Sequence, residues 1–158
     1  MEYIIKKCEY EDLEEVARMY NQLARELKTS NQEEFQQSEL SDNTMLRIIR
    51  SAIKECNLII YVAKYEDEVI GFISGSEKDA FIQVTQVKQI GYIEGTYVKE
   101  EYREKKVLLQ LEEELRREFK RRGFYNIEKS ELESSNTATD VWASRGYQTF
   151  CEQIGKKI

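Results

Sequence analysis

Apolar residues repeat along the chain either at helical spacing or in the short runs typical of β-strands, and each change between the two patterns marks a predicted element. Residues 3–8 form a short apolar start, and residues 11–27 repeat apolar side chains at helical spacing behind an acidic first turn. A second helical pattern covers residues 45–56, after Ser41 and Asp42, which are residue types that cap a helix N-terminus. The chain is therefore predicted to begin with a strand and two helices.

The centre of the chain changes to the period of β-structure. Residues 58–64 and 69–76 are β-rich runs on either side of a short polar turn, which predicts a hairpin, and residues 90–98 predict a further strand. A long amphipathic helix is predicted from about Arg103 to Arg122. The remaining predicted elements are a strand at 124–132, a short helix at 137–144 and a strand at 147–158. This order predicts an α/β (α+β) fold, in which helices pack on a mixed sheet.

The length of 158 residues fits one domain covering residues 1–158, because single cores commonly grow to about 100–200 residues before they split. Histidine is absent, which excludes Ser-His, Cys-His and His-metal mechanisms. The three cysteines are odd in number and have no C-x-x-C spacing, so neither a disulfide framework nor a zinc site is indicated. We therefore expect no metal.

The net charge of −6 disfavours non-specific binding to nucleic acid and favours cationic or neutral small molecules as partners. No stretch of the sequence has the apolar length of a signal peptide or of a membrane span, which needs roughly 20 residues. We therefore expect a cytoplasmic protein with no nucleic acid and no membrane partner. A homodimer remains open.

The predicted helix that follows residues 90–98 offers a site for an anion. The first amides of a helix have no partner within the helix, and the macrodipole makes that end positive. Arg103, Lys105 and Lys106 would add positive charge there. The same residues are also compatible with ordinary exposed charge in front of a helix.

The run YVKEEYREKKV, residues 97–107, resembles the signature of the GNAT superfamily of acetyltransferases, V-x-P-x-Y-R-G-x-G-x-G/A. Val98, Tyr102 and Arg103 stand at matching positions. Glu100 replaces the proline of the signature, and the small residues are replaced by Glu104, Lys106 and Leu108. The resemblance implies that acetyl-coenzyme A (acetyl-CoA) is a co-substrate. The residues implied to bind it are Val98, Arg103, Glu104, Lys105, Lys106, Val107, Leu108 and Asn136.

A longer block, residues 71–103, is similar to the central part of the aminoglycoside 6′-N-acetyltransferases within that superfamily. Ile93, Glu94 and Gly95 stand where that subfamily carries LEG, and Phe81 keeps the expected distance from Glu94. Residues 134–150 resemble the N-x-x-[SA] helix and the strand start that follow. This resemblance implies a six- or seven-stranded, mostly antiparallel sheet that splays at a central cleft and has helices on both faces.

The function implied by the resemblance is acetyl transfer from acetyl-CoA to a primary amine of a small cationic molecule, such as an aminoglycoside. Glu94 would be the base, directly or through water, the Val98 amide would polarise the thioester, and Asp79 and Glu133 would bind ammonium groups. Each of these carboxylates is also compatible with an ordinary solvated face. Two alternatives stay open: a GNAT-shaped binding or regulatory module without catalysis, and an acetyltransferase for polyamines or protein N-termini.

Overall fold

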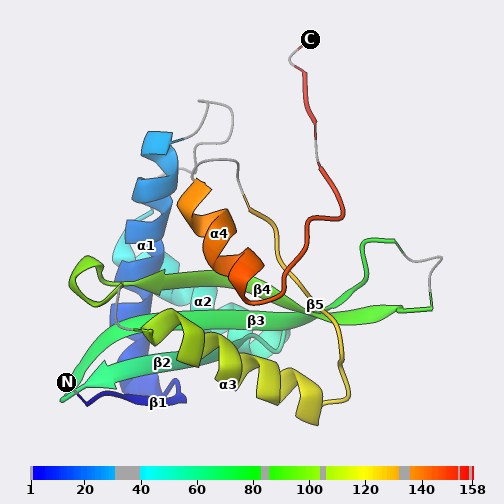
Figure 1. Cartoon of the computed structure of the whole chain (residues 1–158). Helices are drawn as coiled ribbons and strands as arrows, with labels where there is room; N and C mark the ends of the chain where they lie inside the picture. Colours follow the sequence, from blue (N-terminus) through cyan, green and yellow to red (C-terminus); the bar gives the residue numbers. More distant parts are fainter. Residues whose placement is uncertain are drawn as a thin grey trace.

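The computed structural model describes residues 2–30, 40–82, 86–103, 106–131, 136–152, 154–156 and 158 (Figure 1). In this part of the chain, one sheet of five strands has the order β1-β2-β3-β4-β5, antiparallel except for the last pair. The strands are β1 (Ile4–Lys7), β2 (Ile59–Tyr65), β3 (Glu68–Asp79), β4 (Gln89–Val98) and β5 (Ile127–Glu128). The helices are α1 (Leu13–Ser30), α2 (Asp42–Glu55), α3 (Val107–Arg121) and α4 (Asn136–Ser144). None of the described helices is long and apolar enough to cross a membrane.

Helices cover both faces of the sheet, as predicted (Figure 1). On β2, Ile60 and Val62 pack with α1 and α2, whereas Ile59 and Ala63 face α3. Successive side chains of a strand point to opposite faces, so a strand that is buried on both sides is apolar throughout. Each face therefore has a hydrophobic core of its own, and β2 and β3 form the wall between the two cores.

The helix starts differ in how their first amides are satisfied. Ser41 caps α2, because its hydroxyl accepts a hydrogen bond from the Thr44 amide at 3.1 Å, as the sequence predicted. The turn before α1 is closed by Asp12, whose carboxylate accepts from the Glu9 amide at 3.0 Å. Lys106 occupies the cap position of α3 without a side-chain cap. The start of α3 is therefore the exception among these three helices.

Strand β4 contains a bulge at Glu94. Gly95 is opposite Ser74, and Ile93 is opposite Gly75, so Glu94 has no partner in the ladder. Glu94 and Gly95 consequently lie on the same face: Glu94 contacts Ser76, and a Cβ added to Gly95 would be 2.8 Å from the ring of Tyr20 on α1. A bulge of this kind bends a strand and redirects a side chain.

Three predictions about the elements need correction. The described sheet has five strands rather than six or seven, because the described part of 147–158 contains no strand and is mostly exposed. The strand predicted at 124–132 is reduced to β5. Helix α3 begins at Val107 and not near Arg103, because the left-handed backbone of Lys106, with φ of 59°, cannot belong to a right-handed helix.

Candidate active site

The C-terminal half of β4 has an open edge. Strand β5 pairs only with Gly91 and Tyr92, so no described strand continues beside β4 from Ile93 to Val98. The Lys99 amide donates to the Ile70 carbonyl at 3.0 Å. Hydrogen-bonded and non-bonded pairs alternate in an antiparallel ladder, so the N–H and C=O of the preceding residue, Val98, point away from β3. The Val98 amide therefore faces the open edge, where the sheet is splayed.

The N-terminus of α3 follows this edge closely in the chain. The first intrahelical hydrogen bond runs from the Gln110 amide to the Lys106 carbonyl, so the amides of Val107, Leu108 and Leu109 come before it. Within the described residues no side chain caps these amides, and no acidic residue lies in the first turn of α3. Val107 is buried and Leu108 packs against the core on the α3 face, so both side chains turn inward. These amides and the helix dipole can attract an anion.

Lys106 has the backbone conformation that a glycine usually supplies. Its φ of 59° and ψ of 13° lie in the left-handed region, which is strained for residues with a Cβ. Lys106 matches the second glycine of the GNAT signature quoted above. Lys106 therefore has a backbone that glycine adopts without strain, at the position where the signature carries a glycine.

Arg103 lies between the end of β4 and helix α1. Its Nε donates to the Val98 carbonyl at 2.9 Å, and its Nη2 is 2.8 and 2.9 Å from the two carboxylate oxygens of Glu26. The Tyr97 hydroxyl donates to the same carboxylate at 3.2 Å. Partial burial and the negative charge of Glu26 raise the pKa of Tyr97. Sequence reasoning placed Arg103 near a phosphate and missed both Glu26 and Tyr97.

Glu94 is held by two residues of the neighbouring strand. The Ser76 hydroxyl donates to Oε1 of Glu94 at 2.5 Å, and Lys78 Nζ is 2.8 Å from the same oxygen. Lys78 also lies 3.8 Å from the centre of the Tyr92 ring, a contact that favours a cation. Ser76 and Lys78 are opposite Tyr92 and Ile90, so both partners lie on the side of Glu94 that is remote from Val98. The period-2 pattern of β3 was the signal that could have identified them.

Tyr20 stands beside the bulge, on the same face as Glu94. Its hydroxyl is hydrogen-bonded to that of Ser74, which also donates to the Gly95 carbonyl at 3.3 Å. Burial, together with the negative charge of Glu94, raises the pKa of Tyr20 to about 12. Tyr20 is therefore a protonated phenol at neutral pH. The sequence has ten tyrosines, and nothing in their pattern distinguishes this one.

The other predicted site residues are not brought together around Glu94. Asp79 ends β3, and alternation from Ser76 places it with Glu77 on the opposite face, where Glu77 pairs with Arg122 at 3.1 Å. Asn136 is the first residue of α4, but its side chain lies outside the description. Glu104, Lys105 and Glu133 lie outside the described residues. The structure thus brings together Val98 and Arg103 and places Lys106 at the cap position of α3, while Glu94 forms a second group with Ser76 and Lys78.

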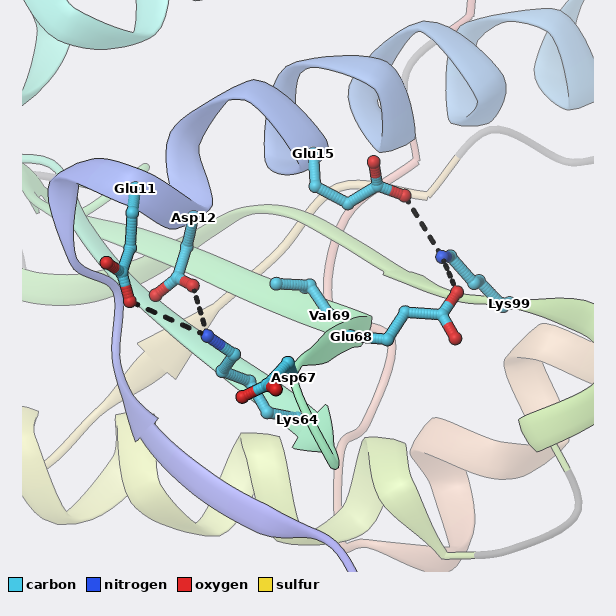
Figure 2. Close-up of a pocket in the computed structure, with 8 residues that line it drawn as sticks. All are labelled: Glu11, Asp12, Glu15, Lys64, Asp67, Glu68, Val69 and Lys99. Atoms are coloured by element: carbon cyan, nitrogen blue, oxygen red, sulfur yellow. Dashed lines mark hydrogen bonds and ion pairs between the residues drawn. The ribbon is translucent and has the colours of Figure 1, made fainter.

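A separate pocket of about 400 Å³ lies between the start of α1 and the β2–β3 turn (Figure 2). Five carboxylates and two lysines line it: Glu11, Asp12, Glu15, Asp67, Glu68, Lys64 and Lys99. Lys64 pairs with Asp12 at 2.9 Å, and Lys99 pairs with Glu15 and Glu68 at 3.0 and 2.6 Å (Figure 2). Its lysines are paired with its own carboxylates, and its charges serve to connect α1 to the sheet.

The profile of the acetyltransferase (GNAT) family matches residues 16–147. The chain therefore belongs to the GNAT acetyltransferase family. A comparison with curated proteins finds no significant match.

Solved structures with the same fold cover nearly the whole chain. The aminoglycoside acetyltransferase AAC(6')-Iy, in complex with a bisubstrate analogue of CoA and acetylneamine, is 16% identical, with coverage of 100% of this chain and 99% of that chain and a TM-score of 0.79. A "predicted acetyltransferase" with acetyl-CoA from Clostridium acetobutylicum is 16% identical, with coverage of 99% and 96% and a TM-score of 0.75. A protein described as a transcriptional regulator from Bacillus halodurans C-125 is 18% identical, with coverage of 99% and 100% and a TM-score of 0.77. Likeness at this level of identity shows the GNAT fold.

Proposed function

We propose that this GNAT-family protein transfers the acetyl group of acetyl-CoA to a primary amine of a small cationic molecule, with aminoglycosides as the first candidates. The observation that carries this proposal is the uncapped start of α3 directly after the open edge of β4. An anionic group on the α3 amides and an acyl group beside Val98 would then belong to one extended molecule.

The described residues fit such a co-substrate. Among the described residues no side chain caps the amides from Val107 to Leu109, and the inward-turned Val107 and Leu108 do not cover them. Lys106 keeps the left-handed backbone that lets the chain turn into the helix. When bound, acetyl-CoA supplies a thioester, whose thiol has a pKa near 8.5 and is a tolerable leaving group.

Different residues of the chain would act on the thioester of acetyl-CoA and on the acceptor amine. The outward N–H of Val98 can stabilise negative charge that develops on the thioester oxygen. Glu94 is proposed as the base that accepts a proton from the acceptor amine, through water, because its carboxylate leans away from Val98. The buried phenol of Tyr20 keeps its proton at neutral pH and donates a hydrogen bond to Ser74 on the same face, beside the bulge. Glu133 remains a proposed acceptor contact on the resemblance alone, and Asp79 would approach the acceptor only from the opposite face.

The test combines binding and turnover. Acetyl-CoA is titrated by calorimetry, and thiol release is then measured with a kanamycin-like aminoglycoside and with spermidine. Glu94→Gln should lower kcat by about 10²–10⁴-fold and change KM little, because a base acts mainly in the transition state. The matched control is Glu77→Gln, an exposed carboxylate on the opposite face of the neighbouring strand, which should leave kcat unchanged.

Two results would contradict this proposal. Equal turnover by the parent protein and by Glu94→Gln would remove Glu94 from the reaction. No thiol release with any amine would leave the family membership standing without the enzyme.

A second candidate function, a binding or regulatory module without catalysis, is favoured by one observation. Lys106 introduces a Cβ and strain where the GNAT signature carries a glycine. If acetyl-CoA shows no saturable binding at millimolar concentration, this second function becomes the better account.

A further inference from the structure

Two hydrogen bonds hold the peptide that joins Val98 and Lys99. Its carbonyl accepts from Arg103 Nε at 2.9 Å, and its N–H donates to the Ile70 carbonyl at 3.0 Å. The guanidinium of Arg103 is itself held by both carboxylate oxygens of Glu26, at 2.8 and 2.9 Å. Two nitrogens of this planar group are therefore engaged, Nε by the Val98 carbonyl and Nη2 by Glu26, which fixes the guanidinium in orientation as well as in position.

We propose that Arg103 is a positioning residue that, anchored by Glu26 on α1, fixes the Val98 peptide, and that it is not a phosphate contact. The proposal rests on the transferase function proposed above. In that function the Val98 N–H must point at the thioester oxygen.

The covalent geometry of the strand connects Arg103 to that N–H. The C=O and N–H of one strand residue point to the same side, so fixing the Val98 carbonyl also fixes the direction of its amide. The Tyr97 hydroxyl, 3.2 Å from Glu26, holds the residue before Val98 to the same carboxylate. Glu26 therefore restrains the end of β4 at two successive residues.

The negative charge of Glu26 beside Arg103 also favours a positioning role over a phosphate contact. Glu26 favours the charged guanidinium and, against partial burial, raises the pKa of Arg103. A phosphate that recruited Arg103 would have to displace the Glu26 carboxylate from Nη2 or bind close to it, where two anions repel. The uncapped amides of α3 carry no such competitor in the described residues.

The first experiment compares acetyl-CoA with acetyl-pantetheine, which keeps the thioester but lacks the pyrophosphate. Arg103→Lys keeps the positive charge but loses the two guanidinium nitrogens that contact Val98 and Glu26. Glu26→Gln weakens the contact that holds the guanidinium to α1. For both variants we expect kcat to fall about 10–100-fold with either acyl donor, because small misplacements of a positioned group cost that much. The KM for acetyl-CoA and the affinity for CoA should stay within about twofold of the parent values, since no phosphate contact is lost.

The matched control is Glu15→Gln. Glu15 is also on α1 and pairs with Lys99 at 3.0 Å, so it connects the same helix to the same end of β4 without touching the Val98 peptide (Figure 2). This variant should keep kcat with both donors. A loss of kcat equal to that of Glu26→Gln would show that kcat depends on the α1–β4 contacts in general and not on the Val98 peptide, and would overturn the proposal.

The opposite assignment makes opposite predictions. If Arg103 binds phosphate, Arg103→Lys should impair acetyl-CoA and spare acetyl-pantetheine, and Glu26→Gln should release the guanidinium and tighten CoA binding. Either result would overturn the positioning role.

A final measurement does not depend on turnover. The Val98 amide signal in a nitrogen-15 correlation spectrum should shift, and hydrogen exchange of the Lys99 amide, which donates to the Ile70 carbonyl, should accelerate, in Arg103→Lys and Glu26→Gln but not in Glu15→Gln. If the parent protein releases no thiol, the proposed function fails while this measurement still decides the positioning role. An unchanged Val98 amide in both variants would refute it.

Discussion

At the scale of single residues, strain is concentrated at three positions. Asn57, Glu66 and Lys106 are the non-glycine residues with positive φ in the described part of the chain. A side chain in the left-handed region costs roughly 1 kcal/mol, and glycine avoids that cost. Lys106 differs from the other two because it immediately precedes the amides at the start of α3.

Lys106→Gly should therefore stabilise the protein. We expect a gain of about 0.5–1 kcal/mol in the free energy of unfolding, reduced from the full relief of strain because glycine also gives the unfolded chain more freedom. Denaturant melts measure the gain, and calorimetry should show CoA binding that is unchanged or tighter. Glu66→Gly is the matched control, since it relieves similar strain in the β2–β3 turn and should not affect CoA. A loss of stability in Lys106→Gly would contradict this account of the α3 start.

At the scale of elements, a buried carboxylate joins the start of α1 to β1 and β2. Asp12 is 2% exposed and lies 2.9 Å from Lys64 and 3.6 Å from Lys6. Burial by itself would raise the pKa of Asp12, but Lys64 and the Glu9 amide outweigh it and lower the pKa below its ordinary value of 3.8. Because the folded pKa is the lower one, this stabilisation is present above about pH 4 and is lost as pH falls through the folded pKa.

Asp12→Asn should cost about 2–4 kcal/mol at pH 7, because removing one member of a buried pair leaves its partner uncompensated. The difference from the parent protein should shrink as pH falls below about 4, where the parent loses the same charge. Chemical denaturation at pH 7 and pH 3 measures both. Glu11→Gln is the control, since Glu11 is exposed and 3.8 Å from the same lysine. A difference that stays constant with pH would show that charge is not the cause.

The elements also show where sequence reasoning succeeds. The spacing of apolar residues in α1, α2 and the β2–β3 hairpin is a local property of the sequence, and these elements form where they were predicted. The end of the chain was misassigned as a strand because pairing depends on a distant partner that the local pattern cannot reveal. Cys151 illustrates this: it belongs to the expected strand, yet it is exposed.

The candidate site follows the same distinction. Val98 and Lys106 belong to one short stretch of sequence, so the resemblance was sufficient to name them together. The pairing of Arg103 with Glu26 joins residues far apart in the chain, and both charges look like ordinary surface residues in the sequence. The bulge at Glu94 was equally hidden, because glycine and tyrosine residues along β4 obscure the change of phase that brings Ile93 and Val98 to the same core.

At the scale of the whole molecule, the two hydrophobic cores share one sheet. The core under α3 includes Trp142, the only tryptophan, and the other includes Met19 on α1. Because β2 and β3 contribute to both cores, we propose that the chain unfolds as a single domain. Loss of packing on one face should then destabilise the other.

Met19→Ala tests this proposal from the face opposite Trp142. The substitution should cost about 2–5 kcal/mol, the usual cost of truncating a buried methionine. Trp142 fluorescence and far-UV circular dichroism should both report the same lowered transition midpoint. A fluorescence transition unaltered by Met19→Ala would mean that the two faces unfold independently.

The bulge in β4 has a consequence for how such a protein can change during evolution. The ladder pairs Ile93 with Gly75 and Gly95 with Ser74, so it would close regularly if Glu94 were deleted, and every later side chain would keep its face. Glu94 is supernumerary to the sheet. Loss or gain of a single codon could thus remove or supply the carboxylate that we propose as the base, whereas the same change at Tyr97 would turn Val98 to the other face. On this strand, an insertion or deletion at position 94 is a small genetic step that can add or remove the proposed base without a change of fold.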